Sequence, residues 1–172
     1  MNDFNQEKTV EDQELTTTTT QYLTFLLDDE VFAVDISKIR EVLEFSSVTK
    51  VPRTPLFMRG VINLRGSVVP VVDMRAKFLM PQTEKTVNTC IIILEIMTDD
   101  GVTVMGALAD SVQEVMELEP GKIEPPPKIG TRLRSDFLLG MGKQSGKFIM
   151  ILDIDKIFSA DELSQAQEAA AA

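Results

Sequence analysis

Short apolar runs alternate with polar turns along most of the chain, and this pattern predicts a fold made mainly of β-strands. In three places two such runs flank a short polar segment, as expected of a β-hairpin. The pairs are 22–27 with 31–34, 61–64 with 68–72, and 90–96 with 102–107. The last pair is joined by 98–101, which ends in Asp-Gly, a strong hairpin signal. Together with a buried strand expected at 147–152, the spacing indicates an all-β barrel or sandwich.

Helical patterns are confined to two segments. Within 35–44, apolar residues recur at spacings of three and four, which predicts a short amphipathic helix or a helix-to-strand turn. The last residues, 161–172, read as a helix, and Ser159 lies three residues before Glu162 in the pattern of a capping box. The alanines at this end favour a helix but offer little to pack.

The two halves of the chain resemble each other. Residues 57–78 align without a gap on 137–158, and 39–44 align on 112–117. The identical pairs of the longer alignment are Phe57 and Phe137, Gly60 and Gly140, Gly66 and Gly146, Asp73 and Asp153, and Phe78 and Phe158. We interpret the chain as two copies of one β-unit. Two small packed barrels fit this better than a solenoid, because solenoids need at least three repeats.

Composition and charge limit the possible classes of protein. The 172 residues suffice for one domain or for two small ones in contact, and 44% are hydrophobic, which excludes a wholly disordered chain. No apolar run approaches the ~18 residues of a membrane helix, and the polar N-terminus is not a signal peptide. The net charge of −10 comes mostly from the two ends and argues weakly against nucleic acid as a partner. A single cysteine favours a reducing cytoplasm.

These features divide the chain into three parts. Residues 1–20 end in five threonines after an acidic run, and they are expected to form a disordered acidic tail. Residues 21–159 form the β-rich body, and 160–172 are expected to form a helical tail.

The residue types argue against several kinds of catalytic site. The chain has no histidine, so it can form neither a Ser-His-Asp triad nor a Cys-His pair. The glycines of 140–147 do not match a phosphate-binding loop, because five residues separate the outer pair and Phe148 follows the lysine. Cys90 begins an apolar run and is expected to be a small buried residue. A hydrolase or nucleotide-binding enzyme that uses carboxylates is therefore disfavoured, and the residues indicate a binding module.

Arg65 is the candidate functional residue that the pattern singles out. It lies in the turn between two strongly apolar strands, and the repeat places Ser145 at the equivalent position, so the fold does not require arginine there. Glu41, whose equivalent is Glu114, lies in the segment 35–44. The alternative for Arg65 is a solvated turn cation, paired or not with a carboxylate. Such surface pairs contribute only ~0–1 kcal/mol.

Three stretches of the chain resemble the CheW family of bacterial chemotaxis coupling proteins. They are YLTFLLDDEVFAVDISKIREVLEF, VPRTPLFMRGVINLRGSVVPVVDMRAKF and FLLGMGKQSGKFIMILDIDKIFS. The second carries the most specific signal, the run Asn63–Gly66 followed by Pro70 and Asp73. The resemblance covers 21–159. It implies two intertwined five-stranded SH3-like β-barrels with partly exchanged strands, short connecting helices and a C-terminal helix. The first barrel is expected over roughly 21–80 and the second over roughly 87–159.

Members of this family are adaptors rather than enzymes. The resemblance implies a cytoplasmic protein that joins the tips of transmembrane chemoreceptors to the regulatory domain of the histidine kinase CheA in membrane-associated arrays. It implies no cofactor, metal, nucleic acid or membrane insertion. The kinase contact of the second barrel is expected around 99–101 and 138–146. The alternatives are a coupler of a related array-type pathway, such as pilus motility, and a regulatory domain fragment of the CheV or CheA type.

The resemblance also implies which residues bind partners. Arg65 matches a family arginine needed for receptor or kinase coupling, and Glu41 matches a glutamate that resembles its ionic partner. Ile39 and Val42 flank Glu41, and Gly60 precedes the hairpin that carries Arg65. All five are expected on the receptor-facing side of the protein.

Overall fold

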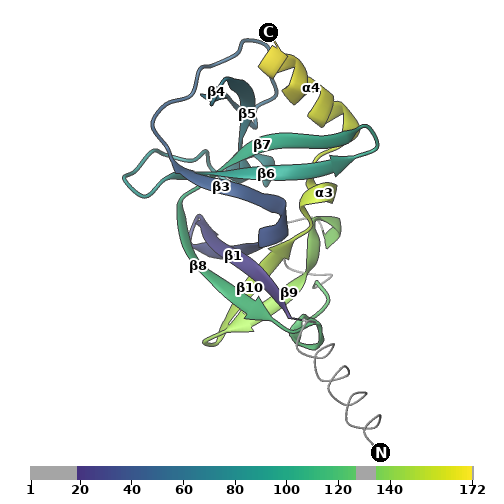
Figure 1. Ribbon diagram of the computed structural model, residues 1–172. Helices are drawn as coiled ribbons and strands as arrows, with labels where there is room; N and C mark the ends of the chain where they lie inside the picture. The colour runs from purple at the N-terminus through teal and green to yellow at the C-terminus, as the bar shows by residue number, and fades with distance from the viewer. Residues whose placement is uncertain (1–18, 127–134, 172) are drawn as a thin grey trace, which may run out of the picture.

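Two five-stranded sheets, one above the other, make up most of the molecule in the computed structural model (Figure 1). The structure describes residues 19–126 and 135–171, so the expected tail at 1–20 lies almost entirely outside the described residues. Strands predominate and each sheet curls on itself, which confirms the predicted double barrel.

The regular elements are short and follow one another closely. The strands are β1 (Thr20–Leu27), β2 (Glu30–Asp35), β3 (Ile39–Glu44), β4 (Met58–Leu64), β5 (Ser67–Asp73), β6 (Cys90–Thr98), β7 (Gly101–Ala109), β8 (Ser111–Leu118), β9 (Leu138–Gln144) and β10 (Lys147–Leu152). The 3-10 helices are η1 (Ile36–Lys38), η2 (Pro120–Lys122) and η3 (Ser135–Phe137), and the α-helices are α2 (Met74–Lys77), α3 (Ile154–Ile157) and α4 (Ala160–Ala171).

The three hairpins predicted from the apolar pattern are present as antiparallel pairs. β1 pairs with β2, β4 with β5, and β6 with β7. The turn between β4 and β5 has left-handed backbone at Arg65, with φ of 51°, and at Gly66, with φ of 88°. Ser145 and Gly146 have φ of 52° and 80° in the equivalent turn between β9 and β10. Two consecutive residues with positive φ give a tight turn that suits the twist of the strands.

The two halves of the chain exchange their first hairpins. One sheet, which we call barrel A, has the strand order β8-β1-β2-β10-β9. The other sheet, barrel B, has the order β3-β6-β7-β5-β4. The hairpin β1–β2 therefore pairs with strands of the second half, and β6–β7 pairs with strands of the first. As a result, each of the expected ranges 21–80 and 87–159 supplies strands to both barrels.

The internal repeat read from the sequence is confirmed by the structure. β4, β5 and α2 occupy the places in barrel B that β9, β10 and α3 occupy in barrel A. The amide of Asp73 donates to the carbonyl of Phe57 at 2.7 Å, and the amide of Asp153 donates to the carbonyl of Phe137 at 2.8 Å. β5 and β10 each pair in parallel with a strand of the hairpin that the other half supplies, β7 and β2 respectively.

Three local expectations change in the structure. The segment 35–44 divides into η1 and β3, so of the two alternatives the helix-to-strand turn is correct. Cys90 is half-buried rather than buried. Phe148 is exposed, although 147–152 was expected to be a buried strand, because successive side chains of a strand point to opposite faces and its neighbour Ile149 points inward.

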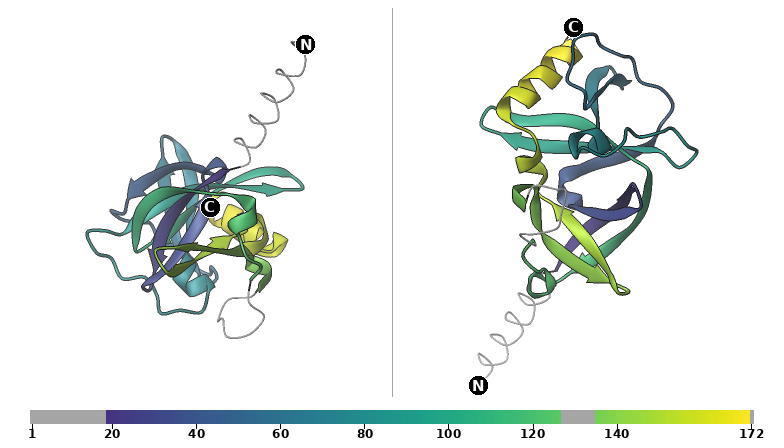
Figure 2. Two further views of the ribbon diagram at one scale, coloured as in Figure 1. Left: turned by 90° about the horizontal axis from the view of Figure 1, so that it is seen from below. Right: turned by 180° about the vertical axis from the view of Figure 1, so that it is seen from behind.

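The C-terminal helix α4 packs against barrel B, as Figure 2 shows. Its predicted capping box is confirmed: the amide of Ser159 donates to the Glu162 carboxylate at 2.9 Å, and the amide of Glu162 donates to the Ser159 hydroxyl at 3.1 Å. The expectation that the alanines have little to pack is wrong, since Ala166 and Ala169 are buried together with Leu163. Small side chains let the helix backbone approach the strands closely.

Two polar joints hold the barrels together at equivalent places in the repeat. In the first, Arg75 of α2 donates to Asp110, which lies between β7 and β8, at 2.6 Å. The amide of Asp28, in the β1–β2 turn, donates to the same carboxylate at 2.7 Å. Burial alone would lower the pKa of Arg75, but the hydrogen bond to Asp110 and its charge raise the pKa overall.

The second joint has the opposite polarity. Lys38 of η1 donates to Asp155 of α3 at 2.8 Å, and the amide of Met97, on β6, donates to the same carboxylate at 2.9 Å. Asp155 is the repeat equivalent of Arg75. The two joints therefore share one design with the charges reversed.

Candidate functional site

Arg65 and Glu41, the two side chains expected to pair, form an ion pair at the edge of barrel B. Nη2 of Arg65 lies 3.0 Å from Oε1 and 2.9 Å from Oε2 of Glu41. The turn that carries Arg65 is held by Asn63, whose Oδ1 accepts the amide of Gly66 at 2.9 Å. The side chain of Arg65 is 73% exposed and that of Glu41 is 26% exposed. A partner could therefore reach the guanidinium without breaking the pair.

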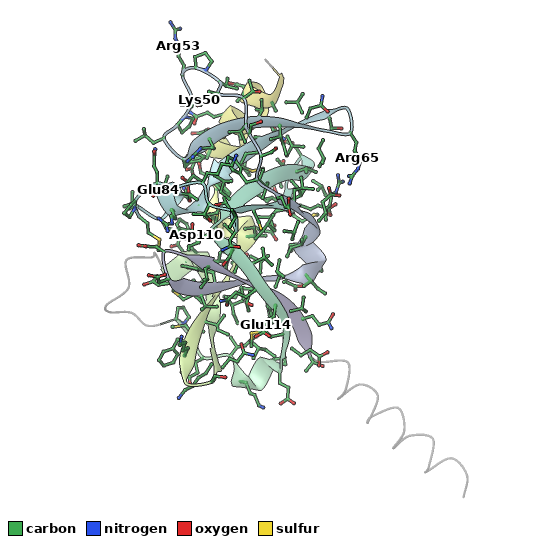
Figure 3. The ribbon with its side chains drawn as sticks, turned by 90° about the vertical axis from the view of Figure 1, so that its left-hand side faces the viewer. Lys50, Arg53, Arg65, Glu84, Asp110 and Glu114 are labelled. Atoms are coloured by element: carbon green, nitrogen blue, oxygen red, sulfur yellow. The ribbon has the colours of Figure 1, made fainter. Side chains whose placement is uncertain are left out.

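The pair joins the two sides of barrel B where its edge strands meet, a line that we call the seam of the barrel. β3 and β4 are the two edge strands of this sheet; Glu41 lies on β3, and Arg65 follows β4. Main-chain hydrogen bonds already bridge the seam, because the amide of Thr49 donates to Val61 at 2.9 Å and the amide of Val61 donates back at 2.8 Å. The ion pair is thus an addition to a seam that the backbone closes. Figure 3 shows Arg65 projecting from the side of this barrel.

The packing at the same seam explains why residue 60 is a glycine. It is buried with φ of 151°, and a Cβ atom there would lie 2.3 Å from the carbonyl oxygen of Thr49. In barrel A, a Cβ atom at Gly140 would lie 2.6 Å from the carbonyl oxygen of Glu124. Because glycine has no side chain, the segment that crosses the seam can lie close to the backbone at both positions. A part for Gly60 in partner binding stays a prediction, which the structure limits to positioning the hairpin.

The five predicted site residues fall into two groups. Arg65, Glu41 and Val42 reach the surface of barrel B, where Val42 is exposed. Ile39 packs against the main apolar core, and Gly60 is buried beneath the seam. The first group can touch a partner directly, and the second can act only by holding the first in place.

The equivalent positions of barrel A carry no such pair. Glu114 and Ser145 stand where barrel B has Glu41 and Arg65. Among the described residues, Glu114 forms no ion pair, and Figure 3 shows it on the lower barrel, well away from Arg65. The seam of barrel A is still bridged, by the amide of Met141 donating to the carbonyl of Glu124 at 2.8 Å and the amide of Glu124 donating back at 2.9 Å.

Exposed apolar side chains mark equivalent places on the two barrels, and only one of them, Val42, was predicted from the sequence. Val42 and Val68 are exposed on barrel B, and Val115 and Phe148 are exposed on barrel A. The repeat aligns Val42 with Val115 and Val68 with Phe148. Large exposed apolar side chains at a defined place indicate a contact surface. The signal was available in the alignment, where apolar residues pair at strand positions that face outward.

The two loops expected to carry a single kinase contact lie on different barrels. Asp99–Gly101 forms the turn between β6 and β7 in barrel B, whereas 138–146 forms β9 and the following turn in barrel A. A partner that touches both would therefore contact both barrels.

Within 19–126 and 135–171, no three His, Cys, Asp or Glu side chains are grouped so as to hold a metal ion. No helix in that part of the chain is long and apolar enough to cross a membrane. What the described residues offer is a surface for contact, with an exposed ion pair on barrel B and apolar side chains on both barrels.

Comparisons with known proteins agree with the fold and the motifs. The family model of the CheW-like domain matches residues 21–162. The chain is 33% identical to the chemotaxis protein CheW of Klebsiella aerogenes over 84% of each chain. It is 34% identical to the chemotaxis protein CheW of Thermotoga maritima over 80% of this chain and 86% of that protein. The crystal structure of the scaffolding protein TtCheW from Thermoanaerobacter tengcongensis matches with a TM-score of 0.74 at 34% identity, covering 83% of this chain and 90% of that one.

Proposed function

The chain belongs to the CheW family, and from that premise we propose that it is an adaptor coupling chemoreceptors to the histidine kinase CheA in bacterial chemotaxis. It works in the cytoplasm, where it is recruited to membrane-associated receptor arrays, and it acts by contact rather than by turnover. An adaptor of this kind can change kinase activity only if it binds the active and inactive states with different affinity.

The exposed ion pair of Arg65 and Glu41 is the observation that links this proposal to particular residues. Both barrels close their seams with the same two main-chain hydrogen bonds, and within the part of the chain that the structure describes only barrel B adds an ion pair across its seam. Because an exposed pair contributes little to stability, its presence is better explained by an interaction with a partner. A guanidinium at the rim of an interface orients the partner and discourages wrong ones.

The exposed apolar side chains suggest what kind of partner lies against each barrel. Val42 and Val68 on barrel B, and Val115 and Phe148 on barrel A, lie on or beside strands at the edges of the sheets. An exposed strand edge with apolar side chains suits another β-structure. The regulatory domain of CheA has the same double-barrel fold by family resemblance. We assign these two surfaces to kinase contacts, with Arg65 and Glu41 at the rim of the first. This assignment replaces the receptor-facing placement that the family resemblance implied for Arg65, Glu41 and Val42.

Calorimetry with a purified CheA regulatory domain tests this assignment. We expect saturable one-to-one binding by the unaltered protein. The substitution Val42→Asp places a charge in the apolar surface, which should weaken binding about tenfold or more, as truncation of a central contact does. The control is Lys122→Glu, because Lys122 is exposed on η2 and belongs to neither apolar surface. The control should bind like the unaltered protein.

Two outcomes would contradict the proposal. If the unaltered protein does not bind the kinase domain, the coupling function as stated is wrong, although the family assignment is unaffected. If Val42→Asp binds as well as Lys122→Glu, the kinase does not touch this edge of barrel B. Binding of a receptor tip fragment, measured with the same two variants, then tells whether the receptor occupies the edge instead.

A further inference from the structure

A second exposed surface of barrel B lies on two long loops and is separate from the Arg65 edge. The first loop joins β3 to β4, and the second joins α2 to β6. Together they enclose an open hollow of about 790 Å³ beside β4. We call their exposed basic and apolar residues the loop surface, which consists of Lys50, Arg53, Leu56, Leu79, Lys85 and Val87. Figure 3 shows Lys50 and Arg53 on the opposite side of barrel B from Arg65.

The floor beneath the loop surface is rigidly held. Asp73 is only 2% exposed, and it accepts hydrogen bonds from the amide of Thr83 at 2.9 Å and from its hydroxyl at 2.7 Å. Arg59 donates to the carbonyl of Thr83 at 3.1 Å and lies 3.4 Å from the Asp73 carboxylate. Because these bonds fix the second loop against β4 and β5, a partner would meet a preformed hollow. Preorganisation lowers the entropy cost of binding.

The cations of the loop surface have not been neutralised within the chain. Among the described residues, no carboxylate lies within ion-pair distance of Lys50 or Arg53. Lys85 donates to the carbonyl of Ser46 at 2.7 Å and lies 5.6 Å from the centre of the Phe45 ring, so no carboxylate of the described residues neutralises it. The acidic side chains nearby are Glu84 at the rim of the hollow and Glu168 of α4, which shares a neighbouring hollow with Arg53, while Asp73 is buried and fully bonded. On a chain with a net charge of −10, this local excess of positive charge is distinctive.

The apolar side chains of the loop surface are more exposed than any others described on this molecule. Leu56 and Leu79 are each 88% exposed, and Val87 is 98% exposed. Leu79 has φ of 60°, a left-handed conformation that is unfavourable for a leucine, and Arg53 has the same φ of 60°. Backbone strain in exposed residues that pack against nothing is more often associated with function than with folding.

We propose that the loop surface docks an acidic segment of a partner protein that also carries apolar side chains. Lys50 and Arg53 meet the carboxylates, while Leu56, at the hollow, and Leu79, on the second loop, cover the apolar side chains. Electrostatic attraction speeds the encounter, and apolar contact supplies most of the affinity. A purely anionic ligand such as nucleic acid would make no apolar contact with the three exposed apolar side chains. This surface acts independently of the Arg65 edge.

The test uses the full-length protein and synthetic peptides. The main probe is a short amphipathic peptide of glutamate and leucine, capped at both ends. A twin peptide replaces glutamate by lysine, and a short single-stranded oligonucleotide of equal charge serves as a non-peptide anion. Calorimetry at low salt measures binding to the unaltered protein, to the double variant Lys50→Glu with Arg53→Glu, and to Leu79→Ser. The matched control is Lys122→Glu, an exposed lysine of η2 beside barrel A.

We expect the glutamate–leucine peptide alone to bind the unaltered protein. The double charge reversal should weaken that binding about tenfold or more, and Leu79→Ser should weaken it severalfold. Lys122→Glu should change it less than about twofold, since the charge lies far from the loops. All variants should keep the melting temperature of the unaltered protein, because these side chains are exposed.

Several results would overturn the inference. Equal binding of the acidic and basic peptides would show that charge does not select the ligand. Tighter binding of the oligonucleotide than of the acidic peptide would show that the surface is an anion site and not a protein-docking site. Absence of peptide binding, or an equal effect of Lys122→Glu and the double variant, would show that the loop surface has no such ligand. None of these results depends on whether the protein binds CheA.

Discussion

Barrel A and barrel B close their seams in the same way and then diverge. In each, paired main-chain hydrogen bonds join a loop to an edge strand, Glu124 to Met141 in barrel A and Thr49 to Val61 in barrel B. In each, a glycine leaves room for the segment that crosses the seam. Among the described residues, barrel B alone adds an exposed ion pair across its seam, and it carries the helix α4 on its outside.

The comparison separates what the fold needs from what has been added to it. Features shared by both barrels, such as the seam bridges and the glycines beneath them, are requirements of the repeated unit. Features found in one barrel at a position that the other fills with an unrelated residue, such as Arg65 against Ser145, are not. The unshared features are therefore the better candidates for partner binding.

The largest expected difference between the barrels lies in the aspartates after β5 and β10. Asp73 is buried and accepts two hydrogen bonds from Thr83, whereas Asp153 makes no side-chain cap bond and lies 3.7 Å from Lys156. Asp73→Ala should lower the free energy of unfolding by roughly 3 kcal/mol, because buried donors lose their acceptor. Asp153→Ala should lower it by less than about 1 kcal/mol. Urea unfolding measures both, and equal losses would show that the two barrels use this position alike.

The next difference concerns the two joints. Arg75 and Asp110 are mostly buried and linked by two bonds, at 2.6 and 3.1 Å. Lys38 and Asp155 are more exposed and linked by one, at 2.8 Å. Double-mutant cycles with alanine should give a coupling free energy of about 2 kcal/mol for the first pair and below about 1 kcal/mol for the second. A larger coupling for Lys38 and Asp155 would mean that burial does not decide the strength of the joints.

Local patterns predicted the strands well but not the pairing between halves. The turn chemistry around Arg65-Gly66 and Asp100-Gly101 marks each hairpin, because left-handed backbone needs particular residues. Nothing in the sequence of β1–β2 states which half it will join, since either half offers an equivalent edge. The repeat alignment shows that the two halves have similar strands. Because they are similar, the first hairpin of each half can pair with the strands of the other half.

The residues of the candidate site were likewise only partly predictable from the sequence. Arg65 was found because the repeat and the family resemblance both point to it, whereas Glu41 was found from the resemblance alone, since the repeat places Glu114 at its equivalent position. Phe148 was missed because an apolar residue in an apolar strand reads as core unless the face it points to is known. The buried Ala166 was missed because an alanine's packing depends on how closely its helix approaches the strands.

A smaller effect should appear where α4 is attached to barrel B. Burial would raise the pKa of Glu162, but hydrogen bonds from Lys77 and Ser159 bring it below the usual 4.5. A pKa lowered by folding stabilises above that usual value, and the contribution is lost as pH falls below it through the folded pKa. Glu162→Gln should therefore cost less than about 1 kcal/mol near neutral pH and nothing in acid. Urea unfolding of both proteins across this pH range checks the sign, and a cost that grows in acid would contradict it.

The most direct test of the account gives barrel B the residue that barrel A already has. In Arg65→Ser the free energy of unfolding should stay within about 1 kcal/mol of the unaltered protein, because the main chain closes the seam. Binding to the CheA regulatory domain, measured by calorimetry on the same samples, should weaken severalfold, because Arg65 lies at the rim of the contact. A stable variant that binds like the unaltered protein, or a variant whose loss of binding merely follows a large loss of stability, would contradict the claim that this ion pair serves the partner rather than the fold.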